Sequence, residues 1–334
     1  MSAMKAIQIT EYGGPDVLVL REVPRPQPGS NEVLVRLDYV GAGFGDTYMR
    51  KGYYRPPHTY ATHLPFIPGI DGVGEVVALG EGVTDISIGE RVTYALGHHS
   101  YAEYAAVPAW KIVKVPADVN SQVACALMIT GLTAYYLSHL LYPLGTGSTC
   151  LVHAGAGSVG QILIQLAHSL GAQVWTTVGS VQKKAVVEAL GVRSAILYQE
   201  ENFVERVRDE TGGRGVDVVY DSVGLETYRR SMQCLRPRGV CALYGAASGI
   251  PECVRPMQDL AENGSIFVTR SHLAHYITRR EELEKASSSL FELYRNRKVR
   301  VELNHRQFAL SQAADAHRAL EARETTGKIL LKVQ

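Results

Sequence analysis

The sequence predicts an α/β protein that joins a β-rich region to a doubly wound, mostly parallel sheet of six strands. Short apolar runs separated by Gly and Pro clusters fill residues 1 to about 120. From about residue 149, apolar strands alternate with amphipathic helical segments. This alternation is typical of a parallel sheet with helices on both faces. A length of 334 residues allows one large or two medium domains.

The first region contains runs with the alternation of a half-buried strand. They cover residues 6–10, 33–39, 74–79, 91–94 and 102–107. The tail after residue 271 resumes this style, with a helix (280–296), a β-like piece (299–303), a helix (311–323) and a strand (328–333). We therefore expect the tail to rejoin the first region. The expected domains are residues 1–125 with 271–334, and residues 126–270.

The second region alternates strands with helices. The expected strands are 149–153, 173–178, 195–198, 217–221, 240–244 and 266–269, and the expected helices are 159–170, 182–190, 203–211 and 226–235. Gly171 and Gly191 follow two of these helices, where a C-terminal cap favours glycine. The apolar stretch 123–145 contains Thr, Gly, Ser and His. It predicts a buried helix pair, because a membrane span needs about 20 apolar residues.

Composition argues against several classes of protein. The formal net charge is +1 with Lys and Arg spread along the chain, which gives no electrostatic footprint for nucleic acid or an anionic membrane. The five cysteines are odd in number and never spaced as Cys-x-x-Cys, so reduced thiols are expected rather than disulfides. Residues 1–16 alternate like a strand and lack the apolar core of a signal peptide. We expect a cytoplasmic protein.

Gly155, Gly157 and Gly160 form a Gly-x-Gly-x-x-Gly pattern directly after an apolar strand. The first glycine suits a tight turn, the second lets the backbone approach a pyrophosphate, and the third allows close packing of helix on strand. The helix that begins near Ser158 directs its free N–H groups at the phosphates. The pattern predicts dinucleotide binding. A plain structural turn is the alternative, and the repeated strand–helix alternation disfavours it.

The acidic residue that usually holds the adenosine ribose about 20 residues further on is absent. Thr, Val, Gly179 and Ser180 occupy that place, and Lys183 and Lys184 follow. A carboxylate would repel a 2′-phosphate, whereas small residues leave room and a lysine can pair with it. We therefore expect NADPH rather than NADH. The alternative is that both lysines are solvated helix residues.

Several segments resemble one known family. These are EYGGPDVL (11–18), DTYMRKGYYRPP (46–57), PFIPGIDGVGEVVALGEGV (65–83), GLTAYYL (131–137), VVYDSVG (218–224) and VTR (268–270). They resemble the zinc-independent NADPH:quinone oxidoreductases of the medium-chain dehydrogenase/reductase superfamily, in the same order over essentially the whole chain. The resemblance implies a GroES-like β-rich catalytic domain plus a Rossmann domain. It also implies a homodimer that extends the Rossmann sheet through an edge strand, for which we expect 266–269.

Zinc-dependent members of this superfamily carry an early catalytic Cys, a Gly-His-Glu turn and a four-cysteine lobe. Here the Cys position falls at Gly43, the turn reads Gly69-Ile70-Asp71, and no lobe interrupts residues 89–116. We expect no bound metal, and we interpret His98 and His99 as a surface loop pair. Without a Lewis acid, hydride addition to a quinone or a conjugated carbonyl compound is the favoured chemistry.

The family's Asn-x-x-Asp-x-Tyr segment reads here with Gly43, Asp46 and Tyr48. The resemblance implies Tyr48 as the hydrogen-bond donor to the substrate and Asp46 as a second catalytic residue. Tyr54 is expected as a catalytic-pocket wall, and Tyr136 as a wall that also contacts the cofactor. Any of these tyrosines could instead be an amphipathic residue with its hydroxyl turned outward.

The resemblance also implies a set of residues that surround the cofactor. Besides the three glycines of the turn, they are Ser158, Val159, Gly179, Ser180, Lys183, Tyr198, Val223, Tyr244, Gly245, Ala247 and Arg323. The leading hypothesis is an NADPH-dependent reductase of quinones or activated conjugated carbonyl compounds, by one- or two-electron transfer. The alternatives are a dedicated alkene or enoyl reductase of the 2-haloacrylate type, and a non-catalytic NADPH-binding protein like the lens crystallins of this family.

Overall fold

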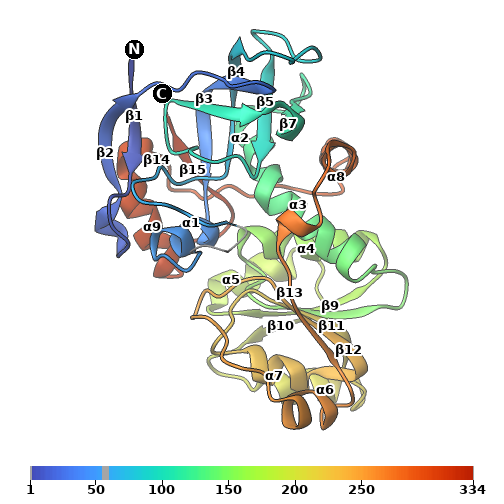
Figure 1. Ribbon diagram of the computed structural model, residues 1–334. Helices are drawn as coiled ribbons and strands as arrows, with labels where there is room; N and C mark the ends of the chain where they lie inside the picture. Colours follow the sequence, from blue (N-terminus) through green and yellow to red (C-terminus); the bar gives the residue numbers. More distant parts are fainter. Residues whose placement is uncertain (1, 55–59, 334) are drawn as a thin grey trace. The chain divides into compact units, whose positions relative to one another are not determined.

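The computed structural model describes residues 2–54 and 60–333 (Figure 1). The chain divides into two compact units, which we describe separately. The first unit comprises Met1–Leu132, Ile277–Arg295 and Leu303–Gln334, and the second comprises Thr133–Tyr276 and Asn296–Glu302. The tail after residue 302 therefore belongs to the same unit as the N-terminal region.

The first unit is built on a seven-stranded sheet. Its strand order is β14-β15-β3-β4-β5-β7, and β6 pairs with β3. These strands are β3 (Glu32–Ala42), β4 (Asp71–Leu79), β5 (Arg91–Ala95), β6 (Tyr104–Pro108), β7 (Ile112–Lys114), β14 (Phe308–Ala309) and β15 (Ile329–Lys332). A separate antiparallel pair consists of β1 (Ala3–Gln8) and β2 (Val19–Pro24). Helices α1 (Phe44–Arg50), α2 (Ser121–Ala126), α8 (Arg280–Arg295) and α9 (Ala313–Glu321) also belong to this unit.

The expected strands of the first region and the C-terminal strand are confirmed, but other expectations differ. The prediction of a β-like piece at 299–303 is wrong, because those residues form no strand. Only Leu303 makes an isolated bridge, to Lys328. The apolar alternation of this piece reflects burial of Val299 rather than pairing. The sequence did not predict α1, a helix too short to show a periodic pattern.

The second unit contains a parallel six-stranded sheet in the order β10-β9-β8-β11-β12-β13. The strands are β8 (Thr149–Val152), β9 (Gln173–Val178), β10 (Ser194–Leu197), β11 (Val216–Asp221), β12 (Leu235–Leu243) and β13 (Phe267–Arg270). Figure 1 shows α4 (Ser158–Ser169) and α5 (Val181–Glu188) on one face, and α6 (Phe203–Glu210) and α7 (Tyr228–Gln233) on the other. The doubly wound sheet is confirmed, and β13 is one of its edges.

The apolar stretch after residue 120 forms one helical run, Ser121–Leu141, so the expected helix pair is wrong. It consists of α2 (Ser121–Ala126), α3 (Leu132–Tyr135) and two π-helical segments, Leu127–Gly131 and Tyr136–Leu141. Gly131 lies within the run, and its missing side chain lets Leu290 pack closely: an added Cβ would lie 3.1 Å from Leu290 Cδ1. Among the described residues this is the one helix long and apolar enough to cross a membrane, and 78% of its most apolar window is buried.

Candidate functional site

The glycine turn after β8 meets the steric demands that its sequence suggests. A Cβ on Gly155 would lie 2.0 Å from Thr176 Oγ1, and one on Gly160 would lie 2.6 Å from the Ala154 carbonyl oxygen. Both positions therefore require glycine. A Cβ on Gly157 would meet only the Ala154 oxygen, at 3.1 Å, so the other side of this turn is open.

Helix α4 begins at Ser158, and no side chain caps its first turn. Ser158 and Val159 therefore present first-turn backbone amides at a helix N-terminus, the arrangement that binds phosphate groups. Gly157, which is open on one side, directly precedes these two residues in the chain. This part of the turn fits the pyrophosphate of a dinucleotide.

The expected 2′-phosphate residues come together at the ends of β9 and β10. The Ser180 hydroxyl caps α5 by accepting a hydrogen bond from the Lys183 backbone N–H at 3.3 Å. A Cβ on Gly179 would lie 3.2 Å from the Tyr198 hydroxyl oxygen, so this hydroxyl fills the space next to Gly179. Lys183 and Lys184 are both half-buried in the first turn of α5.

The loops after β11 and β12 bring together four other expected cofactor residues, Val223, Tyr244, Gly245 and Ala247. Backbone hydrogen bonds join the segment after β12 to the end of β11 and its loop: Tyr244 N donates to Asp221 O at 2.9 Å, and Ala247 N donates to Ser222 O at 3.1 Å. A Cβ on Gly245 would lie 2.4 Å from Ser222 O, so only glycine allows this approach.

Asp46 is buried in α1 and shapes the start of that helix. Its Oδ2 accepts a hydrogen bond from Gly43 N at 2.9 Å, and the buried Tyr101 hydroxyl also interacts with this carboxyl group. Burial, followed by the nearby Asp71 carboxylate, raises the pKa of Asp46 to about 7, although the Lys328 charge lowers it. At neutral pH Asp46 is therefore divided between its protonated and ionised forms.

Arg50 anchors the other end of α1. Its fully buried guanidinium donates to both Glu321 carboxylate oxygens at 2.8 and 2.9 Å, and to Gly13 O at 3.0 Å. Its third partner is His317 Nδ1 at 3.1 Å. Burial and the Arg50 charge lower the pKa of His317 to about 3, so the imidazole is neutral and Nδ1 accepts. Helix α1 is thus fixed to α9.

Tyr48 and Tyr54 lie in one aromatic cluster, which we define as Phe44, Tyr48, Tyr53, Tyr54 and Tyr60. The Tyr48 ring is 6.2 Å from Phe44, 6.1 Å from Tyr53 and 6.0 Å from Tyr54, measured between centroids. Tyr54 is 5.4 Å from Tyr60. The structure therefore brings together the expected donor and one expected pocket wall. The end of the quoted motif, residues 55–57, lies outside the described residues.

Two expected residues have different surroundings. Tyr136 belongs to the second unit, where its hydroxyl lies 3.0 Å from Ser271 Oγ and its ring stacks on Tyr276 at 4.4 Å. Arg323 belongs to the first unit and is an exposed residue just after α9, with φ of 57°. The other expected cofactor residues all belong to the second unit.

Within residues 2–54 and 60–333, no three His, Cys, Asp or Glu side chains are grouped as metal ligands. His98 and His99 are both exposed, with ring centroids 6.1 Å apart. Asp71, at the place of the zinc enzymes' Gly-His-Glu turn, instead forms a buried ion pair with Lys328 at 3.0 Å.

The fold and these residues can be compared with known proteins. A family described as "Zinc-binding dehydrogenase" matches residues 158–292, and an "Alcohol dehydrogenase GroES-like domain" matches residues 29–117. A quinone oxidoreductase from Pseudomonas aeruginosa is 40% identical, over 98% of this chain and 99% of that relative. The chain belongs to the quinone oxidoreductase family of the medium-chain dehydrogenase/reductase superfamily.

Two other members of this superfamily bear on the chemistry. A 2-haloacrylate reductase from a Burkholderia species is 39% identical, over 98% of this chain and 99% of that relative. The crystal structure of Escherichia coli quinone oxidoreductase complexed with NADPH matches with a TM-score of 0.93 and 38% identity, over 99% of this chain and 100% of that one. Quinone oxidoreductases and a 2-haloacrylate reductase are thus similar to this chain to about the same degree.

Sequence reasoning missed one group of residues in this quinone oxidoreductase fold. Asp221, Thr227, Ser231, His153 and Thr177 form a buried hydrogen-bonded group at the carboxyl ends of β8, β9 and β11. Two signals could have found it. Asp221 ends a strand directly before the VG of VVYDSVG, and His153 is a polar residue between an apolar strand and the glycine turn.

Proposed function

We propose that this protein is an NADPH-dependent, zinc-independent oxidoreductase that transfers hydride to quinones or activated conjugated carbonyl compounds. The glycine turn supports this most directly, because its open side at Gly157 and the uncapped start of α4 fit a dinucleotide pyrophosphate. The solved NADPH complex of a relative with the same fold supports the same cofactor. The bound cofactor would supply the hydride.

In this proposal Lys183 pairs with the 2′-phosphate that distinguishes NADPH from NADH. Lys183→Ala should weaken NADPH binding by about 1–3 kcal/mol and leave NADH binding nearly unchanged. Lys184→Ala is the matched control, since it removes the same charge one residue away. Equal losses for both cofactors in the Lys183 variant would remove this residue from the 2′-phosphate site.

On the substrate side, Tyr48 donates a hydrogen bond to the oxygen on which negative charge develops as hydride arrives. One such donor is worth about 2.7–4 kcal/mol. Tyr48→Phe should therefore lower kcat for enones or haloacrylates roughly 10²-fold, with little change in NADPH affinity. Quinone rates should fall much less, because formation of an aromatic hydroquinone supplies driving force.

Tyr53→Phe is the control, because Tyr53 stacks on Tyr48 but its side chain is exposed. Unchanged rates for both substrate classes in Tyr48→Phe would exclude Tyr48 as the donor. Prolonged treatment with a strong zinc chelator should leave turnover intact, and stoichiometric zinc with loss of activity on its removal would contradict zinc independence.

A dedicated 2-haloacrylate-type alkene reductase is the second candidate, and Gly43 is the observation that favours it. This residue replaces a polar family side chain, and an added Cβ would meet only Asp46 Oδ2, at 3.9 Å. Its φ of −154° is open to any residue. Gly43→Asn should therefore fold normally. If it raises quinone turnover relative to haloacrylate turnover, Gly43 sets the substrate preference.

We also propose a cytoplasmic homodimer. The edge strand β13 carries Phe267, whose side chain is 63% exposed. An exposed apolar edge strand favours pairing with a second copy. Light scattering should give twice the chain mass, and Phe267→Lys should give a monomer.

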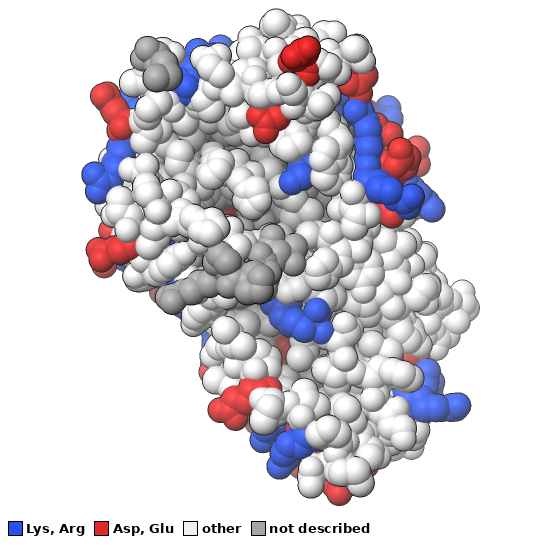
Figure 2. All heavy atoms as spheres, viewed as in Figure 1, with Lys and Arg blue, Asp and Glu red and all other residues white. Residues whose placement is uncertain are grey.

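Four cysteines are buried as free thiols and Cys253 is exposed, which suits the reducing conditions of the cytoplasm. On the face in Figure 2, basic and acidic side chains are interspersed, without a single-sign patch.

A further inference from the structure

Asp221 is the last residue of β11, and its carboxylate is fully buried. Its Oδ1 accepts hydrogen bonds from the backbone N–H groups of Val223 at 2.8 Å and Gly224 at 3.0 Å. The Thr227 hydroxyl lies 2.9 and 2.8 Å from the two carboxylate oxygens. The Ser231 hydroxyl donates to Oδ2 at 2.7 Å. Neutral donors therefore surround both oxygens, and two of them are the backbone of the loop after β11.

The contacts continue from Ser231 to two neighbouring strands. Because the carboxylate can only accept, the Ser231 hydrogen points to Asp221, and the Ser231 oxygen accepts from His153 Nε2 at 2.9 Å. Burial lowers the pKa of His153, so the ring is neutral. Its Nδ1 then accepts from the Thr177 hydroxyl at 2.8 Å. The donor and the acceptor are therefore fixed in each hydrogen bond from Thr177 through His153 and Ser231 to Asp221.

This group lies at the switch point of the sheet. Strand β8 has β9 and β10 on one side and β11, β12 and β13 on the other. A dinucleotide binds across such a point, at the carboxyl ends of the strands. The 2′-phosphate candidates follow β9 and β10, so the adenosine half belongs on that side. The loops after β11 and β12 are therefore placed for the nicotinamide half.

We propose that Asp221, Thr227, Ser231 and His153 form a positioning cluster that fixes the loop of residues 222–224 for the nicotinamide half of the cofactor. The cluster acts through backbone: Asp221 holds the amides of Val223 and Gly224, and Val223 O accepts from Ser248 N at 2.8 Å. The loop after β12 is thereby fixed as well. None of the four side chains needs to touch the cofactor.

The loop geometry depends on this cluster because Gly224 is in a constrained conformation. Its φ is +90°, and an added Cβ would lie 2.6 Å from Gly249 O. Without Asp221, the amides of Val223 and Gly224 would need other acceptors, and the loop would shift. A displacement of about 1 Å in a reacting group can cost about 10²-fold in rate.

The test compares NADPH with its adenosine half, 2′,5′-ADP, which lacks the nicotinamide. In Asp221→Asn one carboxylate oxygen becomes an amide donor facing other donors. We expect NADPH affinity to fall by about 10-fold or more and 2′,5′-ADP affinity to change by less than about 2-fold. Thr227→Val is the milder second variant, because it keeps the side-chain shape and removes one hydroxyl. Binding is measured by NADPH fluorescence and by calorimetry.

Asp217→Asn is the matched control, since Asp217 is a buried carboxylate on the same strand, at the opposite end. This variant should melt at a lower temperature but keep the ratio of the two affinities. Parallel losses of NADPH and 2′,5′-ADP binding in Thr227→Val, or unchanged binding of both in Asp221→Asn, would overturn the proposal.

The inference rests on the cofactor binding proposed above but not on the substrate or on Tyr48. Failure of every variant to distinguish NADPH from 2′,5′-ADP would refute the cluster while leaving the reductase intact. Absence of NADPH binding in the unmodified protein would refute the proposed function itself.

Discussion

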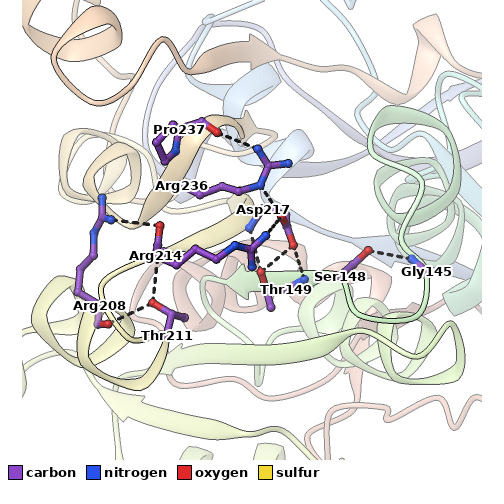
Figure 3. A network of polar contacts seen from close by, with 10 residues as sticks. Gly145, Ser148, Thr149, Arg208, Thr211, Arg214, Asp217, Arg236 and Pro237 are labelled. Carbon is purple, nitrogen blue, oxygen red and sulfur yellow. Dashed lines mark hydrogen bonds and ion pairs between the residues drawn. The ribbon is translucent and has the colours of Figure 1, made fainter.

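The two ends of β11 each bury an aspartate, but the two carboxylates have different partners. At the amino end, Asp217 accepts from the Arg214 and Arg236 guanidinium groups at 2.7 and 2.5 Å, and from Thr149 N and Oγ1 at 2.7 and 2.8 Å (Figure 3). At the carboxyl end, Asp221 has only hydroxyl and backbone N–H donors. The same residue type, four positions apart on one strand, thus meets charge at one end and neutral donors at the other.

This difference separates stability from function in the sheet. Burial alone would raise the pKa of Asp217, but the hydrogen bonds from Arg236 and Thr149 and the Arg214 charge lower it overall. That ion-paired group joins β8, β11 and β12 where no ligand is expected. Asp221 instead shapes loops at the edge where dinucleotides bind. Asp217 therefore stabilises the sheet, and Asp221 determines the shape of its ligand-binding edge.

The largest expected effect is on stability at the amino end. Asp217→Ala leaves two guanidinium groups and the Thr149 amide without their shared acceptor. Breaking a buried ion pair from one side costs about 3–5 kcal/mol, and partial exposure of Arg214 and Arg236 favours the lower value. Urea titration should show that the free energy of unfolding falls by about 3 kcal/mol in this variant. A large loss of NADPH affinity in the folded variant would break the contrast between the two ends.

The stability contributed by a third buried carboxylate, Asp46, should respond to pH in the opposite direction. Its folded pKa of about 7 lies above the ordinary aspartate value of 3.8, so the folded state binds the extra proton and stability falls as pH rises through 7. Asp46→Asn can still cap Gly43 through its amide oxygen. As pH rises from about 5 to 8, the free energy of unfolding of the wild type should fall by roughly 2–3 kcal/mol more than that of this variant. Identical pH profiles would show that Asp46 stays ionised.

The smallest expected effect is the loss of stability at mildly acidic pH that depends on His153, at the carboxyl end of the sheet. His153 has a folded pKa below 6.5, because burial and the Arg230 charge lower it more than Asp221 raises it. The unfolded state gains the proton first, so stability is lost as pH falls below 6.5. Asp217 has a depressed pKa, so its stabilisation is lost only below 3.8.

As pH falls from about 7.5 to 5, the free energy of unfolding of the wild type should fall by about 1–2 kcal/mol more than that of His153→Phe. Asp217→Asn should show the same loss as the wild type in that range. His317, whose pKa is also lowered by burial, titrates in this range in both proteins, so part of the acid sensitivity remains in His153→Phe. Equal losses of unfolding free energy in the wild type and His153→Phe would show that His153 does not contribute.

Local sequence signals predicted the second unit well. Strand Gln173–Val178 matches its expected bounds, and Gly171 and Gly191 end their helices with φ of 82° and 80°. These features depend on neighbours along the chain. The Asp221 cluster could not be predicted in this way, because its members come from segments near residues 153, 177 and 221–231 and meet only when parallel strands align. Helix α1 was missed because it is short, and because its C-terminal end is fixed by contacts of Arg50 with distant residues.

Transfer of deuterium tests the proposed reductase most directly. NADPH carrying deuterium at the reactive nicotinamide carbon would be mixed with the enzyme and an enone, a 2-haloacrylate or a quinone, in the presence of a zinc chelator. Mass spectrometry should find one deuterium on the reduced enone or haloacrylate, and spectroscopy should show NADPH consumed with the quinone. NADPH that binds but passes neither deuterium nor electrons to any of the three substrates would contradict the account and leave a non-catalytic NADPH-binding protein.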